Sequence, residues 1–203
     1  MDAVACSVVA YLPEPLEEFV DGLRRRLNPQ FARWRAHVSI LPPRLLFQAP
    51  ELSQARPQEP PPSLPSLPPM EDLLDPLREQ CLLLDPFEAT LSEVQTFWPA
   101  NGVVYLSIAH GADRLTELHQ RLNAGALARV EPYSYVPHVT IAQELDDAET
   151  HAALREASRE WARYAGSRSF RGESLSLVRQ EPDQRWTDLA PVLLGGALKP
   201  SRR

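Results

Sequence analysis

The sequence predicts an α+β protein with two pseudo-symmetric lobes, in which helices flank a β-sheet in each lobe and a groove separates the lobes. Two observations lead to this prediction. A pattern of strand, helix and strand near the start of the chain recurs in its second half. The second strand of each copy carries a histidine at similar spacing: Val4 lies 33 residues before His37, and Val103 lies 35 residues before His138. The chain therefore reads as a duplicated unit within one bilobal domain over residues 1–200.

The first copy occupies the start of the chain. Residues 4–12 are rich in valine and followed by Pro13, as in a short buried strand. Residues 15–29 have apolar side chains at helical spacing, with acidic residues early and arginines late, which favours a helix. Residues 36–41 return to a strand pattern. The unit is long enough for a crossover connection.

A proline-rich segment follows the first copy. Residues 49–69 contain eight prolines, which cannot donate to a strand ladder or continue a helix, so we expect an extended, mobile insertion. A solvated linker is the simpler interpretation, and a lid or a proline-motif ligand is the alternative. Residues 70–85 then predict a helix with a turn near Pro76, and residues 87–98 predict an alternating strand.

The second copy repeats the order of the first. Residues 102–110 predict a strand, residues 112–127 an amphipathic helix, and residues 135–145 a second strand. The remainder of the chain adds a helix, a closing hairpin and a disordered tail. These last elements are expected over residues 146–164, over residues 170–180 with 185–195, and over residues 197–203.

Composition excludes several classes of protein. The 203 residues are 43% hydrophobic and 24% charged, as in an ordinary globular chain, and the formal net charge is -6. This charge argues against a protein that coats long duplex nucleic acid, although a small anionic ligand or an RNA end remains compatible with it. Cys6 and Cys81 lie in apolar stretches, which predicts core residues in a reducing compartment. Without a signal peptide or a membrane span, we expect a cytoplasmic protein.

The two histidine strands share a motif, written "HVSI" in the first copy and "HVTI" in the second. Side chains alternate between the faces of a strand, so the histidine and hydroxyl of each motif share one face. The intervening aliphatic residues point to the other face, toward the helices. The sequence therefore predicts a groove that holds two imidazoles and two hydroxyls, from His37 with Ser39 and His138 with Thr140.

These paired motifs resemble those of the two-histidine (2H) phosphoesterases, the superfamily of the 2′-5′ RNA ligase-like proteins and cyclic nucleotide phosphodiesterases. The resemblance covers residues 4–195 and implies the LigT-like fold, with antiparallel-rich sheets. His37 and His138 match the two catalytic histidines of the family. Ser39 and Thr140 match the hydroxyl residues that hold the phosphate.

The first motif departs from the second at one flanking position, where Ala36 stands in place of the Pro137 of the second motif. No motif residue is missing. The proline-rich insertion also interrupts the first half, where it bears on the geometry of the lobes and on access of the substrate.

The chemistry of such a family requires these residue types. Opening a 2′,3′-cyclic phosphate needs a base to deprotonate water and an acid to protonate the departing ribose oxygen, roughly in line. An unperturbed imidazole pKa near 6.5 would let one histidine be neutral and the other protonated. Hydroxyls can donate to the non-bridging oxygens, so no metal or other cofactor is needed. We expect a monomer that acts on a nucleotide or an RNA terminus.

Several alternatives are weaker or remain open. The motifs lack the usual zinc spacings, and Ser39 is not at a strand-to-helix elbow, so a zinc site and a serine nucleophile are both disfavoured. A non-catalytic RNA- or nucleotide-binding protein with the same fold is the main rival. Surface or structural roles are expected for His110, His119 and His151. Aromatic residues that could stack a base are Phe97, Trp98, Tyr133 and Tyr135, and arginines that could neutralise phosphate are Arg35, Arg44 and Arg179.

Overall fold

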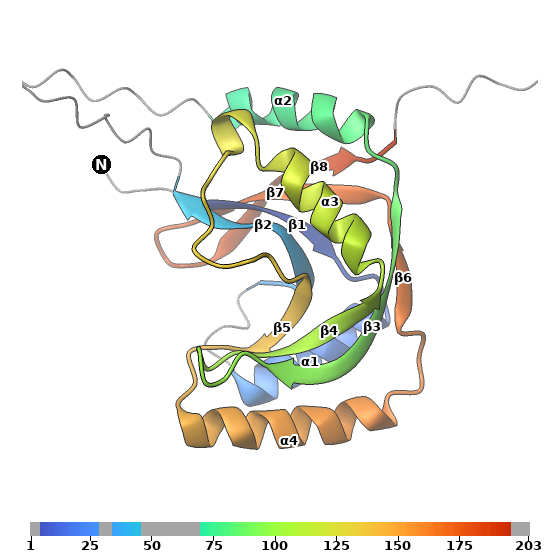
Figure 1. Cartoon of the computed structure of the whole chain (residues 1–203), viewed down its shortest axis with the longest axis vertical. Helices are drawn as coiled ribbons and strands as arrows, with labels where there is room; N and C mark the ends of the chain where they lie inside the picture. The colour runs from blue at the N-terminus through green and yellow to red at the C-terminus, as the bar shows by residue number, and fades with distance from the viewer. Residues whose placement is uncertain (1–4, 29–33, 46–69, 196–203) are drawn as a thin grey trace, which may run out of the picture.

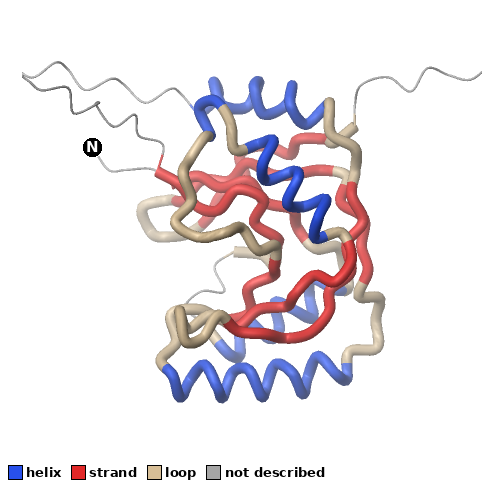
Figure 2. The backbone as a smooth tube through the Cα atoms, viewed as in Figure 1, coloured by secondary structure: helices blue, strands red, loops and turns tan. Residues whose placement is uncertain are grey.

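The computed structural model describes residues 5–28, 34–45 and 70–195. Figure 1 shows its strands and helices, and Figure 2 traces the same backbone by secondary structure. In chain order the elements are β1 (Ala5–Tyr11), α1 (Leu16–Leu27), β2 (His37–Leu45), α2 (Met70–Leu82), β3 (Phe87–Thr96), β4 (Val104–His110), α3 (Ala112–Leu122), a 3-10 turn (Gly125–Leu127), β5 (His138–Ala142), α4 (Asp147–Arg163), β6 (Ser169–Gly172), β7 (Ser174–Gln180) and β8 (Trp186–Leu193).

The described strands form one sheet in the order β6-β3-β4-β5-β2-β1-β7-β8. The two histidine strands, β2 and β5, are neighbours at its centre and pair antiparallel through Val38 opposite Val139. The α+β class and the antiparallel pairing are confirmed. The two predicted sheets are the halves of a single curled sheet, one half on each side of the β2–β5 junction (Figure 2).

The connection inside each repeated unit differs from the prediction. β1 pairs antiparallel with β2, and β4 pairs antiparallel with β5. The expected crossover connection is therefore wrong, because a crossover joins parallel strands. The helix of each unit packs across the junction instead, α1 against β5 and α3 against β2. Each helix therefore packs on the histidine strand of the other unit, which holds the two units together on the buried side of the two motifs.

The curl of the sheet follows from its connectivity. β6 lies at one edge of the sheet and β7 lies next to the other edge, yet only Glu173 separates them along the chain. The two ends of the sheet must therefore approach each other, as Figure 1 shows. Of the predicted closing hairpin, β7 and β8 are confirmed. Residues 170–172 belong instead to β6, which pairs with β3, where Gly172 leaves room for the Phe87 ring.

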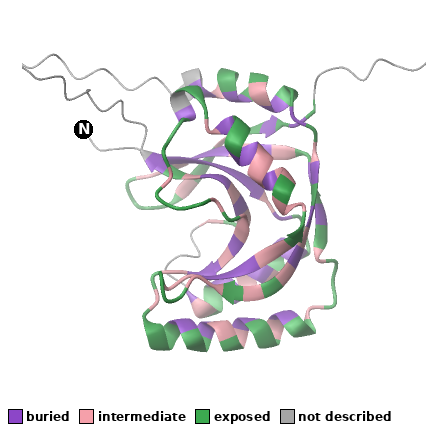
Figure 3. Cartoon of the chain, viewed as in Figure 1, coloured by how far each residue is buried: buried purple, intermediate pink, exposed green. Residues whose placement is uncertain are grey.

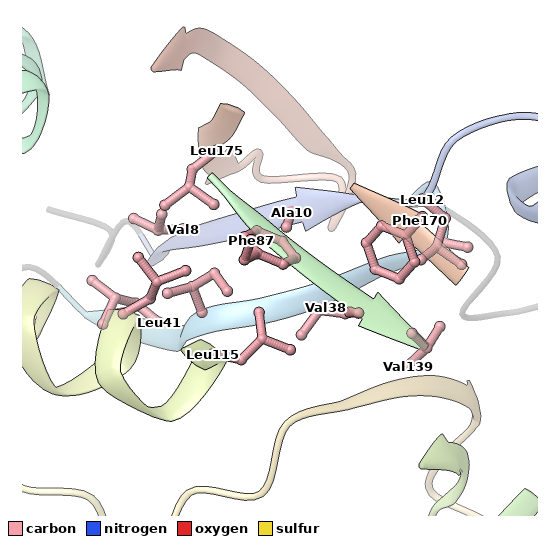
Figure 4. Packing of buried hydrophobic residues seen from close by; sticks show 14 of the residues in the cluster. Val8, Ala10, Leu12, Val38, Leu41, Phe87, Leu115, Val139, Phe170 and Leu175 are labelled. Atoms are coloured by element: carbon pink, nitrogen blue, oxygen red, sulfur yellow. The ribbon is translucent and has the colours of Figure 1, made fainter. Parts of the chain in front are cut away.

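The hydrophobic core lies between the sheet and its helices. Val38, Val139 and Leu115 of α3 are all 0% exposed and belong to one cluster of buried side chains, part of which is drawn in Figure 4. Burying an aliphatic side chain of this size contributes about 1.5 to 3 kcal/mol. The burial of both motif valines in this core, with α3 packed on β2 and α1 on β5, therefore fixes which face of β2 and β5 is left for other side chains.

The helix ends agree with their sequence signals. Asp146 and Glu149 form a capping box at the start of α4, which satisfies backbone N–H groups that would otherwise lack partners. α4 alternates buried and exposed side chains along its length, as Figure 3 shows. Pro76 lies inside α2, which continues through it. No helix in the described ranges has the length and apolar character needed to cross a membrane.

Two predicted segments cannot be compared with the structure. The proline-rich insertion at residues 49–69 and the tail at residues 197–203 lie outside the described residues.

Candidate active site

The predicted alternation along the motif strands is confirmed. Val38 and Ile40 are 0% exposed, Val139 is 0% exposed and Ile141 is 2% exposed. The histidine and hydroxyl of each motif are partly exposed and lie on the opposite face of the strands, because successive side chains alternate. We call this surface the histidine face; it carries His37, Ser39, His138 and Thr140.

The register of β2 against β5 sets the arrangement on that face. The strands are antiparallel with Val38 opposite Val139, so the residue before one valine lies across from the residue after the other. Each histidine therefore faces the hydroxyl residue of the other motif. This gives a two-fold arrangement of the histidine face, with His37 across from Thr140 and His138 across from Ser39.

Both imidazoles are oriented in the same way. Nδ1 of His37 lies 2.6 Å from the carbonyl oxygen of Arg35, and Nδ1 of His138 lies 2.6 Å from that of Val136. A carbonyl oxygen can only accept a hydrogen bond, so each Nδ1 carries the proton. Nε2 of each neutral ring therefore holds a lone pair that can take a proton, as a general base requires.

Aromatic side chains enclose His37. Its ring centroid lies 3.8 Å from that of Trp34 and 6.3 Å from that of Tyr11. Trp34 also stacks on Trp186 of β8, with centroids 4.2 Å apart and planes inclined by 12°, and its Nε1 donates to the Tyr11 hydroxyl at 3.1 Å. The Tyr11 hydroxyl in turn donates to Asp188. The C-terminal hairpin thus helps to build the surroundings of the first histidine.

A smaller aromatic group borders His138. The Phe97 ring meets it edge-on with centroids 5.2 Å apart, and the Tyr105 ring lies 5.1 Å away. Phe97 and Tyr105 stack on each other at 4.3 Å. Phe97, which the sequence placed beside the site, does lie there.

These surroundings oppose charge on the imidazoles. Burial lowers the pKa of His37 to about 3, against the hydrogen bond to the Arg35 carbonyl, and repulsion by Arg24 and by a protonated His138 lowers it further. Burial also lowers the pKa of His138. The expectation of unshifted imidazole pKa values is therefore wrong: both rings are neutral at neutral pH in the free protein, because burial disfavours the charged form.

The two motif hydroxyls are available to a ligand. Within the described residues, neither the Ser39 nor the Thr140 hydroxyl forms a hydrogen bond with the protein. A partly buried hydroxyl is stabilised by a hydrogen-bond partner. A bound phosphate on the histidine face would supply acceptor oxygens for both.

The three arginines that the sequence offered as phosphate ligands are all paired with glutamates. Arg35 makes a bidentate pair with Glu17 at 2.8 and 2.6 Å. The other two pairs, at 2.9 and 2.8 Å, are Arg44 with Glu131 and Arg179 with Glu181. Neutralisation by glutamate leaves these guanidiniums poorly suited to hold a phosphate.

The remaining candidates take different places. His110 and His151 are exposed, while His119 is 6% exposed and stacks on Tyr135, so the surface and structural interpretations hold. Trp98 is 41% exposed and donates its Nε1 hydrogen to Asp147 at 3.1 Å. Tyr133 is 79% exposed on the segment that leads into β5.

Sequence reasoning missed Trp34 and Tyr11 beside His37, and Trp186, which stacks on Trp34. Trp34 precedes His37 by the same three residues by which Tyr135 precedes His138, which was a usable signal. Trp186 is remote in sequence, and only the pairing of β7 with β1 and β8 brings it near.

A cavity of about 530 Å³ lies elsewhere, at the start of α3. Its arginines are already engaged, Arg114 by Glu117 and the Asp85 carbonyl, and Arg171 by Glu173. In the described part of the chain, no three His, Cys, Asp or Glu side chains are arranged to hold a metal ion. The histidine face therefore remains the strongest candidate for chemistry.

Comparison with known proteins agrees with this geometry. A model of the 2′-5′ RNA ligase superfamily matches residues 12–184. A protein of Halalkalibacterium halodurans named as a phosphoesterase is 34% identical over 140 residues, covering 68% of this chain and 69% of that protein. A similarly named protein of Bacillus cytotoxicus is 29% identical over 147 residues, covering 72% of this chain and 73% of its own.

Solved structures share the fold. The protein TT0787 of Thermus thermophilus has a TM-score of 0.56 at 18% identity, over 96% of this chain and 100% of its own. LigT of E. coli, solved with 3′-AMP, has a TM-score of 0.58 at 14% identity, over 95% of this chain and 99% of its own. With the match of the family model over most of its length, the chain belongs to the 2′-5′ RNA ligase superfamily, the two-histidine phosphoesterases.

Proposed function

We propose that the protein is a metal-independent phosphoesterase that acts on 2′,3′-cyclic phosphates or 2′-5′ phosphodiester bonds of nucleotides or RNA ends. His37 and His138 serve as general acid and base, and Ser39 and Thr140 bind the phosphate. The observation that carries this proposal is the pair of imidazoles on adjacent strands, each with Nδ1 bound to a carbonyl oxygen at 2.6 Å and Nε2 left for proton transfer.

The reaction uses the two-fold arrangement of the histidine face. One imidazole takes a proton from water through Nε2 as the water oxygen bonds to phosphorus. The bond from phosphorus to one ribose oxygen breaks, and the other histidine, as imidazolium, gives that oxygen its proton. The product is a phosphomonoester with a free ribose hydroxyl. In ligation the 5′-hydroxyl of a second nucleotide takes the place of water: one imidazole takes its proton as its oxygen bonds to phosphorus, and the other protonates the departing ribose oxygen. The reverse of this ligation step cleaves a 2′-5′ bond to a cyclic phosphate and a free hydroxyl.

Substrate binding prepares the acid. Both imidazoles are neutral in the free protein because burial lowers their pKa values. A phosphodiester anion beside Nε2 favours the charged imidazolium, since an opposite charge within a few ångströms raises a histidine pKa. The Ser39 and Thr140 hydroxyls donate to the non-bridging oxygens as charge builds on them. The negative charge of the substrate therefore stabilises the protonated form of the histidine that acts as the acid.

The choice of a nucleotide or RNA terminus rests on two further points. LigT was solved with 3′-AMP and, separately, with ATP, and the partly exposed ring of Phe97 borders His138 here, so a base has an aromatic surface on which to stack. The formal charge of -6 disfavours long duplexes. A monomer suffices for this site, because both motifs lie on one chain.

Turnover of a 2′,3′-cyclic mononucleotide, measured by chromatography of the products, tests the proposal. His37→Ala and His138→Ala should each lower kcat/KM by about 10² to 10⁴ while the protein stays folded. Exposed His110→Ala is the matched control and should keep full activity. Tight binding of the nucleotide without turnover by the unmodified protein would instead support the non-catalytic nucleotide-binding alternative.

A further inference from the structure

The junction between the two halves of the sheet is narrow. β1 pairs with β2 from Ala5 opposite Leu45 to Tyr11 opposite His37, whereas β2 meets β5 in register only at Val38 and Val139. The two motif histidines lie on either side of this junction. Their separation therefore depends on whatever else holds β2 to the second half of the chain.

Two side chains of the second half bind the backbone of the first motif. The Tyr135 hydroxyl donates to the carbonyl oxygen of Ser39 at 2.8 Å. Nδ1 of His119, on α3, lies 2.8 Å from the carbonyl oxygen of Ile40 and must be the donor, because a carbonyl only accepts. These two carbonyls directly follow Val38, so the side chains hold β2 where pairing with β5 ends.

The two side chains also hold each other. The rings of His119 and Tyr135 stack with centroids 4.0 Å apart and planes inclined by 2°. His119 is 6% exposed, and burial raises the pKa of Tyr135, so its phenol remains a hydrogen-bond donor. A stacked pair with both donors engaged has little freedom to move. We call His119 and Tyr135 the brace.

The brace is continuous with the second motif. Tyr135 stands three residues before His138, and the carbonyl of Val136 orients the His138 ring. One short segment therefore holds the first motif through its tyrosine and the second histidine through its backbone. The corresponding residue of the first half, Trp34, instead lies against its own histidine, with centroids 3.8 Å apart and planes inclined by 35°, so among the described residues the brace exists on one side only.

We propose that His119 and Tyr135 are positioning residues that set the separation of the two motif histidines. The inference rests on the proposed function, in that the benefit of a fixed separation is in-line proton transfer by His37 and His138. The brace touches neither the reacting atoms nor the side chains of the two motif histidines, His37 and His138. It acts through the Ser39 and Ile40 carbonyls, and misplacement of a reacting group by about 1 Å lowers rates by up to about 10².

Tyr135→Phe, compared with Tyr133→Phe, tests the brace. Both variants remove one phenolic oxygen from the same segment, but Tyr133 is 79% exposed. With a 2′,3′-cyclic mononucleotide, Tyr135→Phe should lower kcat about 10- to 100-fold with KM within about twofold, and Tyr133→Phe should match the unmodified protein. A purely structural role would lower the melting temperature and leave kcat of the folded fraction unchanged.

A second measurement does not depend on turnover. The imidazole Cε1 proton resonances of His37 and His138, assigned with the alanine variants, are followed by NMR during a pH titration. Tyr135→Phe should shift these resonances and their midpoints, and Tyr133→Phe should not. If the unmodified protein does not turn over the nucleotide while Tyr135→Phe still moves the resonances, the proposed function fails and the brace stands. Turnover with both readouts equal in the two variants overturns the brace.

His119 gives an independent pair of variants, which decides the question if Tyr135→Phe does not fold. His119→Asn keeps an N–H donor near the position of Nδ1, and His119→Phe keeps only a stacking ring. The brace predicts near-normal kcat for His119→Asn and a loss of about 10-fold or more for His119→Phe. Equal kcat in the two folded variants would show that the bond to Ile40 positions nothing.

Discussion

The depressed pKa of His37 predicts how the stability of the protein depends on pH. An imidazole titrates near 6.5 in an unfolded chain, whereas burial lowers the pKa of His37 in the fold to about 3. Between these values the unfolded chain binds one more proton than the folded protein. The contribution of His37 to the free energy of unfolding is therefore fully present above about pH 6.5 and is lost as the pH falls toward 3. At pH 5 the loss is at most about 2 kcal/mol, since each pH unit is worth about 1.4 kcal/mol and solvent screens a partly exposed ring.

His37→Asn isolates this effect. Asparagine does not titrate, and its side-chain N–H can replace Nδ1 as the donor to the Arg35 carbonyl. Urea unfolding at pH 7 and pH 5 gives the free energy of unfolding for both proteins. The unmodified protein should lose up to about 2 kcal/mol more than the variant on going to pH 5, while His110→Asn, which removes an exposed histidine, should follow the unmodified protein. Parallel losses in His37→Asn and the unmodified protein would refute the depressed pKa.

Three further predictions concern the site and the fold. Ser39→Ala and Thr140→Val should each lower kcat/KM less than loss of a histidine does, because each removes about 3 to 4 kcal/mol of transition-state stabilisation at most. A phosphate-bound structure with both hydroxyls turned away from the phosphate would contradict this. Replacing residues 49–69 with a short glycine linker should leave the melting temperature nearly unchanged, because loop-closure entropy varies slowly with length; a large fall would show that the segment packs. Asp146→Ala should cost about 1 kcal/mol of stability through loss of the capping box at α4, and an unchanged urea midpoint would count against that cap.

The repeated motif made the centre of the fold predictable. A period of two residues in "HVSI" and "HVTI" was enough to place Val38 and Val139 in the core and the histidines on the other face. The direction of strand pairing was not predictable in the same way, because hydrophobic periodicity reports which face of a strand is buried and says nothing about its neighbour. For this reason the expected crossover proved to be an antiparallel pair.

Electrostatics and the wall of the site were the parts that local patterns could not supply. Arg35 looked like a phosphate ligand until folding placed Glu17 of α1 beside it. Trp186 reaches Trp34 only because β8 pairs with β7 and β7 with β1. The same enclosure lowers the imidazole pKa values below the unshifted values expected from the sequence. This difference also arises because burial depends on residues that are distant in sequence.

The pH dependence of turnover tests two-histidine catalysis most directly. On a 2′,3′-cyclic mononucleotide, kcat/KM and kcat should each rise and then fall with pH, with limbs that belong to the coupled pair of imidazoles. The maximum of kcat/KM, which reports the free protein, should lie on the acid side of neutrality, because burial lowers the pKa values of His37 and His138. The maximum of kcat should lie nearer neutrality, because bound phosphate raises these values. Exhaustive EDTA treatment should leave both profiles intact, since hydroxyls and imidazolium meet the phosphate charge. A rate that rises monotonically with pH, or that vanishes with EDTA and returns with zinc, would contradict catalysis by a pair of histidines.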